Sequence, residues 1–323
     1  MAQYIARRLL QSAALLVVIS IVLFALINSV PGGLLTAYEN NPDITPEDYA
    51  RLQAKYGLND PIPVKYVKWA TNLLSGDWGT SFVSKRPVID EIADRLPNTL
   101  LLMGVSFIVT LLIAIPLGIL SALRQYSIFD HIATTFAFAG QSLPVFWFGL
   151  ILIIVFAVVL KGPDGRPLLP GAGMTTPGQP FSLIDLAKHM ILPVTMLSVV
   201  SAAGYMRFMR SSMLEVIYQD YVRTARAKGL AERAIITGHA LRNALIPMVT
   251  LIMLDVPTLF GGAIFTETIF AWPGMGRLFV DAAFKTDYPV LMALLMINAT
   301  LIVLANLAAD VIYAYLDPRI KYS

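Results

Sequence analysis

Few residues of this sequence stand in patterns that support catalysis or metal binding. No glycine is followed by lysine, so the GxxxxGK[ST] loop that cradles phosphates in P-loop ATPases is missing. The chain has no cysteine, which excludes a thiol nucleophile and a thiolate metal site. His131, His189 and His239 are scattered and lack the spacing of a zinc site. We therefore expect no catalytic residue, no cofactor site and no metal site in this chain, and any linked nucleotide hydrolysis must occur in another subunit.

Three polar residues are candidates for a different task, the passage of a solute through a membrane. Asp255 and Glu267 lie in one long apolar run, and Asn298 lies in the next. A carboxylate that faces lipid is costly, so we expect Asp255 to face the bundle interior, a partner subunit or a wet pore. A hydrogen-bonded group that joins two helices and a group that lines a translocation path both fit this position. A proton relay is less favoured, because no chain of His or Glu residues accompanies Asp255.

The stretch Asp220–Pro247 is the most basic part of the chain and lies between two apolar runs. Its basic residues are Arg223, Arg226, Lys228, Arg233 and Arg242, opposed only by Asp220 and Glu232. We predict a helix over 221–228 with Asp220 as its N-cap, a left-handed Gly229 that ends it, and a second helix over 231–244. A short basic loop belongs on the cytoplasmic side of a membrane. A solvated loop that only sets topology would satisfy the charge, but a pair of helices around a glycine favours a rigid docking surface.

The composition places the chain in a membrane. Of its 323 residues 57% are hydrophobic and 14% are charged, against about 25% charged residues in soluble domains. The net charge of +3 is small and is concentrated in the basic stretch, which is a topology signal and not a nucleic-acid footprint. We therefore predict an integral membrane protein in contact with the lipid bilayer and with no nucleic-acid partner.

Six apolar runs predict an all-α fold with six transmembrane helices. The predicted spans are 9–27, 99–122, 132–160, 189–209, 244–270 and 289–316, and residues 210–243 form the predicted cytoplasmic loop. The first run is too long for a signal peptide and lacks a cleavage site, so we read it as a retained span. Six spans and the basic residues near both ends place both termini in the cytoplasm. Kinks are predicted at five prolines, namely Pro116, Pro144, Pro193, Pro247 and Pro257.

Residues 28–98 form a polar insertion between the first and second predicted spans. Amphipathic segments at 45–57, 63–74 and 88–96 predict short helices there. Too few apolar residues are present for an independent domain, so we predict a helical cap on the extracytoplasmic side.

Several stretches resemble the permease subunits of ABC importers, and closely the dipeptide/oligopeptide/nickel branch. They are Asp220–Leu230 (DYVRTARAKGL), 239–247 (HALRNALIP), 76–81 (GDWGTS), 86–92 (RPVIDEI), 267–278 (ETIFAWPGMGRL) and 287–289 (DYP). The broad importer pattern is Glu-Ala-Ala, three residues and Gly, whereas Arg223-Thr224-Ala225 stands in that place here. This departure and the longer spacing from Gly to Pro point to the peptide branch, in which the chain looks like the B-type subunit.

The resemblance implies the transmembrane domain of a type I ABC importer that moves di- or oligopeptides across the cytoplasmic membrane of a prokaryote. It implies a second homologous permease subunit, two cytoplasmic ATPase subunits that bind ATP and Mg, and an extracytoplasmic solute-binding protein. The ATPases would dock on Asp220, Tyr221, Arg223, Thr224, Ala225, Arg226, Lys228, Gly229 and Leu230.

Two groups of alternatives stay open. Within the same mechanism, the solute could be a nickel chelate, glutathione or an oligosaccharide. In a different class, a secondary transporter driven by an ion gradient would show an inverted repeat and paired ionisable groups at the midplane, and neither is evident. A membrane enzyme would need a cluster of acid, base or metal-ligating residues, and none is found.

Overall fold

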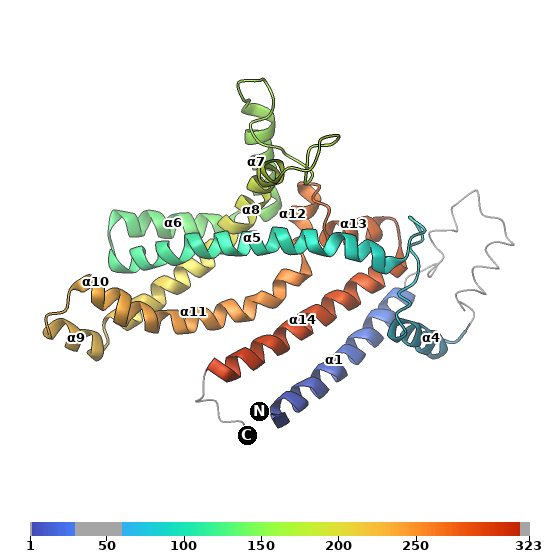
Figure 1. Ribbon diagram of the computed structural model, residues 1–323, viewed down its shortest axis with the longest axis horizontal. Coiled ribbons are helices and arrows are strands. Elements are labelled where there is room, and N and C mark those ends of the chain that lie inside the picture. Colours follow the sequence, from blue (N-terminus) through green and yellow to red (C-terminus); the bar gives the residue numbers. More distant parts are fainter. Residues whose placement is uncertain (1, 30–59, 317–323) are drawn as a thin grey trace. The chain divides into compact units, whose positions relative to one another are not determined.

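The computed structural model of this protein describes residues 2–29 and 60–316, and almost all of them are helical (Figure 1). Outside the helices, the described residues form only two isolated β-bridges, Thr80–Pro87 and Lys161–Pro167. The predicted all-α class is therefore confirmed. By its internal contacts the chain divides into two units, residues 1–98 together with 274–323, and residues 99–273.

Five helical runs in the described residues are long and apolar enough to cross a membrane. They are α1 (Ala2–Asn28), α5 (Val88–Leu123), α8 (Leu183–Ile217), the run Glu232–Phe260 and α14 (Tyr288–Leu316). A sixth is present if α6 (Ile128–Ser142) and the helix that follows it count as one broken span. The described residues thus give five spans, or the predicted six with the broken pair included, and several bounds differ from those expected.

The first unit is built on α1 and α14, which run side by side. The short helix α4 (Ile62–Leu74) packs on α1 through aromatic rings. The ring centroid of Phe24 in α1 lies 5.5 Å from those of Tyr66 and Trp69 in α4. The start of α5 packs on α13 (Met275–Phe284) and α14 around a small apolar core that includes Val88 and Leu294. Of the predicted insertion 28–98, the structure thus shows α4 and the start of α5. The predicted helix at 45–57 lies outside the described residues, and the side of the membrane stays a prediction.

The second unit is centred on α8, which packs against α6, α7 (Val145–Ile153) and α11 (Leu241–Asp255). Its main core combines methionines with small residues, which lets helices approach closely. At Gly118 of α5 an added Cβ would lie 2.7 Å from the backbone oxygen of Met206 in α8. Only glycine therefore permits this approach of the two backbones.

The predicted third span, 132–160, is broken and not merely bent. α6 ends at Ser142, α7 begins at Val145, and the two axes differ by 101°. Pro144 has no N–H and forces Leu143 into extended backbone, so the α6 hydrogen-bond ladder cannot continue. A π-helix, η2 (Ile154–Val159), continues α7 and completes the second half of the broken span.

The predicted fifth span, 244–270, begins and ends earlier than expected. Helix starts at α10 (Glu232–Ala234) and continues through η3 (Ile235–Ala240) and α11 into the 3₁₀ turn η4 (Val256–Gly261). Gly262, at φ +74°, then ends the run, and α12 (Ile264–Ile269) is a separate helix. Pro257 lies in the 3₁₀ turn, where its missing N–H costs little.

The predicted loop 210–243 is also shorter than expected, because α8 reaches Ile217 and helix resumes at Glu232.

Three of the prolines at which kinks are predicted lie inside continuous helices. They are Pro116 in α5, Pro193 in α8 and Pro247 in α11.

Candidate functional site

The basic stretch folds into a short helix, α9 (Asp220–Ala227), followed by a tight turn. Gln219 holds the N-cap position, so the prediction that Asp220 is the cap was wrong by one residue. Asp220 is the first helical residue instead, where its carboxylate still interacts favourably with the helix dipole.

Gly229 ends α9 as predicted, with φ +77°. Its N–H donates to the carbonyl of Arg226 at 2.9 Å, and the N–H of Leu230 donates to the carbonyl of Ala225 at 3.4 Å. This is the Schellman arrangement, which satisfies the last carbonyls of a helix and needs a left-handed residue at this position. The chain reversal is therefore encoded locally.

Two further contacts make the turn a folded unit. Val222 and Ala225 of α9 bury their side chains against Ile235 of η3. Across the turn, Arg226 donates hydrogen bonds of 2.7 and 3.1 Å to the two carboxylate oxygens of Glu232. The carboxylate raises the pKa of Arg226, so the guanidinium stays charged. The segment is thus rigid without help from another chain.

The outer face of α9 carries both charge and apolar surface. It consists of exposed residues at helical spacing and in the turn, namely Tyr221, Arg223, Thr224, Lys228 and Leu230. Tyr221 is 42% exposed and Leu230 is 46% exposed, so this face offers apolar surface beside its charges. Of the nine predicted coupling residues, Ala225 is buried and holds the turn together instead of facing outward.

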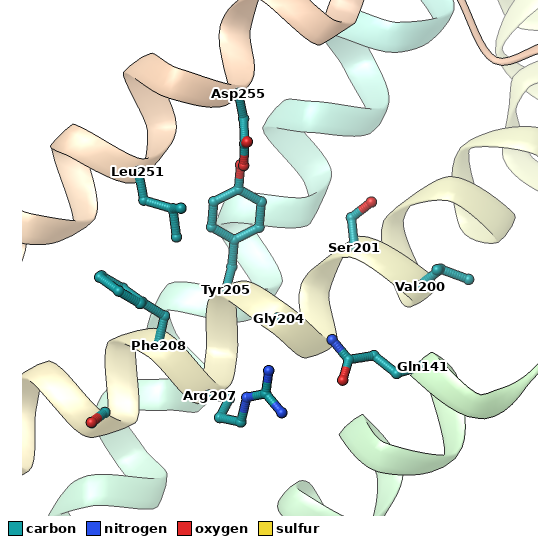
Figure 2. Close-up of a pocket in the computed structure, with 10 residues that line it drawn as sticks. Gln141, Val200, Ser201, Gly204, Tyr205, Arg207, Phe208, Leu251 and Asp255 are labelled. Atoms are coloured by element: carbon teal, nitrogen blue, oxygen red, sulfur yellow. The ribbon is translucent and has the colours of Figure 1, made fainter.

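A second candidate site is an open cleft of about 670 Å³ in the second unit (Figure 2). Its walls come from α6, α8 and α11, helices that belong to the candidate membrane spans, and carry polar groups, among them Gln141, Ser201, Arg207, Ser211 and Asp255. A smaller cavity of about 250 Å³ shares Ser201, Tyr205 and Asp255 with it. Because polar groups cluster where lipid would penalise them, this cleft is a candidate path for a polar solute.

Asp255 lies on the cleft wall and accepts a hydrogen bond from the hydroxyl of Tyr205 in α8. Figure 2 shows the phenol pointing straight at the carboxylate, while Arg207 and Gln141 lie on the side away from Asp255. The two expectations for Asp255 are thus compatible, since the same group joins α11 to α8 and faces the cleft.

Glu267 and Asn298, the other two predicted path residues, are not among the residues that line this cleft. Gly262 separates α12 from the preceding helical run. Glu267 in α12 is fully buried and accepts a 2.8 Å hydrogen bond from Thr99 in α5. Asn298 belongs to α14 in the first unit, where its side-chain oxygen is buried with no hydrogen-bond partner among the described residues. Neither residue lines this cleft, and their place on a translocation path stays a prediction.

Sequence reasoning assigned none of the cleft residues on α8 to the path, and it interpreted Ser201 and Gly204 as small residues suited to close helix contact. Ser201, Gly204, Tyr205, Phe208 and Ser211 follow one another at helical spacing and form one stripe of the cleft wall. That spacing of small and polar residues within an apolar run was the available signal. Within residues 2–29 and 60–316, the structure shows no group of three or more side chains suited to holding a metal ion.

Comparison with known proteins identifies similar sequences along the whole chain. Residues 114–322 match the family described as "Binding-protein-dependent transport system inner membrane component", and residues 1–103 match its N-terminal counterpart. The oligopeptide transport system permease protein AppB of Bacillus subtilis is 48% identical over 323 residues, with all of both chains covered. The dipeptide transport system permease protein DppB of Escherichia coli K12 is 39% identical over 337 residues, covering 100% of this chain and 99% of that one.

A solved structure has a similar fold. An inward-facing structure of the MetNI methionine ABC transporter matches with a TM-score of 0.54 and 18% identity. The match covers 72% of this chain and 98% of the other.

Proposed function

The chain belongs to the family of binding-protein-dependent transport system inner membrane components, and we propose that it is the permease subunit of an ATP-driven peptide importer. Its relatives AppB and DppB are named as oligopeptide and dipeptide transport system permeases. This favours a peptide as the solute over a nickel chelate, glutathione or an oligosaccharide. As a multi-pass protein of the cytoplasmic membrane, with both termini in the cytoplasm, it forms the pore with a second, homologous permease subunit.

The observation that carries the coupling mechanism is the rigid turn around Gly229. The transporter has two cytoplasmic ATPase subunits, which bind ATP and Mg. One docks on the outer face of α9 in this chain, and the other docks on the second permease subunit. When ATP closes the ATPase pair, the turn passes the displacement to α8 and to the helical run that begins at Glu232. The helices then alternate between outward and inward access, and an extracytoplasmic binding protein supplies the peptide.

The peptide itself passes the polar cleft around Tyr205 and Asp255. Its backbone amides need hydrogen-bond partners at membrane depth, and the serines, Gln141 and Asp255 supply donors and acceptors there. This chain therefore holds the path and receives the force, while the chemistry of ATP hydrolysis occurs in its partners.

The decisive experiment uses the complete transporter in liposomes with its binding protein. We compare peptide uptake and ATP hydrolysis for the unchanged chain, Gly229→Pro and Arg226→Glu. Proline cannot adopt φ +77°, and a carboxylate at position 226 would face that of Glu232, so both changes should disrupt the turn and uncouple hydrolysis from uptake. Arg86→Glu, at an exposed ion pair of the first unit, serves as the matched control.

Normal peptide accumulation in both turn variants would remove the coupling role of α9. Uptake by the permease alone under a proton or sodium gradient, without ATPase subunits, would support a secondary transporter instead.

A further inference from the structure

We propose that Asp130 and Arg210 form a clamp that makes the end of α8 and the turn between α5 and α6 move as one body when α9 is displaced. The inference rests on the proposed function, because it concerns how force entering at α9 reaches the membrane helices. It assigns a positioning role to two residues that no sequence pattern singled out.

The clamp is a two-pronged ion pair in the interior of the second unit. Arg210 donates from Nε to Asp130 Oδ1 at 2.8 Å and from Nη2 to Oδ2 at 2.7 Å. The side chain of Asp130 is 3% exposed and that of Arg210 is 24% exposed. Two parallel bonds to one carboxylate fix the angle as well as the distance between the groups.

Asp130 also holds the turn between α5 and α6 in place through hydrogen bonds. It accepts hydrogen bonds from the hydroxyl of Ser121 near the end of α5 and from the backbone N–H of Tyr126 at 2.9 Å. Tyr126 is held at φ +64°, which is uncommon for a residue other than glycine and shows that its surroundings impose the conformation. The carboxylate thus links α5, the turn, α6 and α8.

Arg210 sits at the point where α8 leads to α9. It lies seven residues before Ile217, the last residue of α8, a distance of about 10 Å along the helix. Next to it, an added Cβ on Gly118 of α5 would lie 3.2 Å from the backbone nitrogen of Arg210. The backbones of α5 and α8 therefore lie close together beside the clamp, so the ion pair acts where the two helices are in direct contact.

An ion pair serves this purpose better than apolar packing. Replacing a buried ion pair with well-packed apolar residues is often neutral for stability, so stability alone does not explain the pair. Apolar contacts allow side chains to slide, whereas the fork of Arg210 loses its hydrogen bonds when α8 rotates or shifts. The clamp therefore converts a displacement of α9 into a joint movement of α5, α6 and α8.

A distance measurement tests the clamp directly. The chain has no native cysteine, so Ile128→Cys on α6 and Glu215→Cys on α8, both exposed, can carry spin labels specifically within this subunit. In the complete transporter, the distance distribution between the labels should be the same with and without ATP. In an Asp130→Asn background it should broaden or shift when ATP is added. A shift with ATP in the otherwise unchanged chain, or no effect of Asp130→Asn, would overturn the clamp.

A coupling assay provides the second readout. Asp130→Asn and Arg210→Lys should lower the number of peptides imported per ATP hydrolysed by about 5-fold or more, the lower end of typical coupling between sites. The matched control is Asp94→Asn, at the exposed 2.9 Å pair Arg86–Asp94. If the clamp variants yield less assembled transporter but keep the same ratio of imported peptide to hydrolysed ATP, the pair only stabilises the fold and the clamp is overturned.

The two proposals fail in different ways. If the unchanged transporter carries no peptide, the proposed function is wrong, and the label distances still report whether α6 and α8 move together. The distance measurement on the chain with intact Asp130 also needs no variant that weakens folding.

Discussion

Arg226 and Glu232 face each other across the Gly229 turn, and the guanidinium of one binds both carboxylate oxygens of the other. Both side chains are substantially exposed, at 40% and 56%. An exposed ion pair adds little to stability, so its effect here is geometric. It holds the end of α9 beside the start of the helical run that leads into the membrane.

Exchanging the two charges tests this relationship. Arg226→Glu alone places two carboxylates face to face and should lower peptide uptake per ATP. The double exchange Arg226→Glu with Glu232→Arg restores opposite charges and should recover part of the loss. The measurement is coupled uptake in liposomes. If the double variant is as defective as the single one, Arg226 acts by contacting the ATPase and not by holding the turn.

Leu230 should contribute to docking of the ATPase. It is 46% exposed on the outer face of α9, and Leu230→Ser removes apolar surface that a partner would cover. We expect weaker retention of the ATPase when the tagged permease is purified, on the order of tenfold for a loss of about 1.4 kcal/mol. Leu168→Ser is the matched control, since Leu168 is 47% exposed in the loop between η2 and α8. Equal ATPase retention in both variants would contradict docking at Leu230.

The hydroxyl of Tyr205 should matter for both stability and transport. Tyr205→Phe removes the hydrogen bond to Asp255 and leaves a carboxylate on the cleft wall without that donor. Hydrogen bonds to charged groups contribute about 1.5–3 kcal/mol, so we expect a lower unfolding temperature in detergent and slower peptide uptake. Tyr218→Phe is the control, because its hydroxyl makes only a long 3.4 Å contact with Gln125 at the surface. Identical behaviour of the two variants would show that the Tyr205–Asp255 bond is dispensable.

Gly118 should tolerate no side chain. In Gly118→Ala the new methyl group would press on the backbone of α8 at Met206, and neither backbone can yield easily. Overpacking of this kind costs about 1–3 kcal/mol, which thermal unfolding of the purified subunit would detect. Gly104→Ala in the same helix is the control, because nothing lies within 4 Å of its added Cβ. A Gly118→Ala variant as stable as Gly104→Ala would argue against the close approach of α5 and α8.

Local features of the molecule could be predicted from the sequence because their causes lie within a few neighbouring residues. Gly229 is followed by the start of a new helix, and only a left-handed residue closes the end of α9 there. Long apolar runs need no distant partner to become helices, so α5, α8 and α14 contain the apolar runs 99–122, 189–209 and 289–316, although α5 and α8 extend beyond them. A bend at Pro144 was also predicted, because a missing N–H acts on the chain next to it.

Contacts between distant segments could be found only in the tertiary structure. Asp130 and Arg210 are 80 positions apart, and Tyr205 and Asp255 are 50 apart. No local preference specifies which of many polar residues will meet after the helices pack. The same reason explains why the sequence did not reveal that Glu267 is fully buried and accepts a hydrogen bond from Thr99. The residue types set where helices form and where the chain turns, whereas packing of helix on helix decided which polar groups are paired, which are buried and which face the cleft.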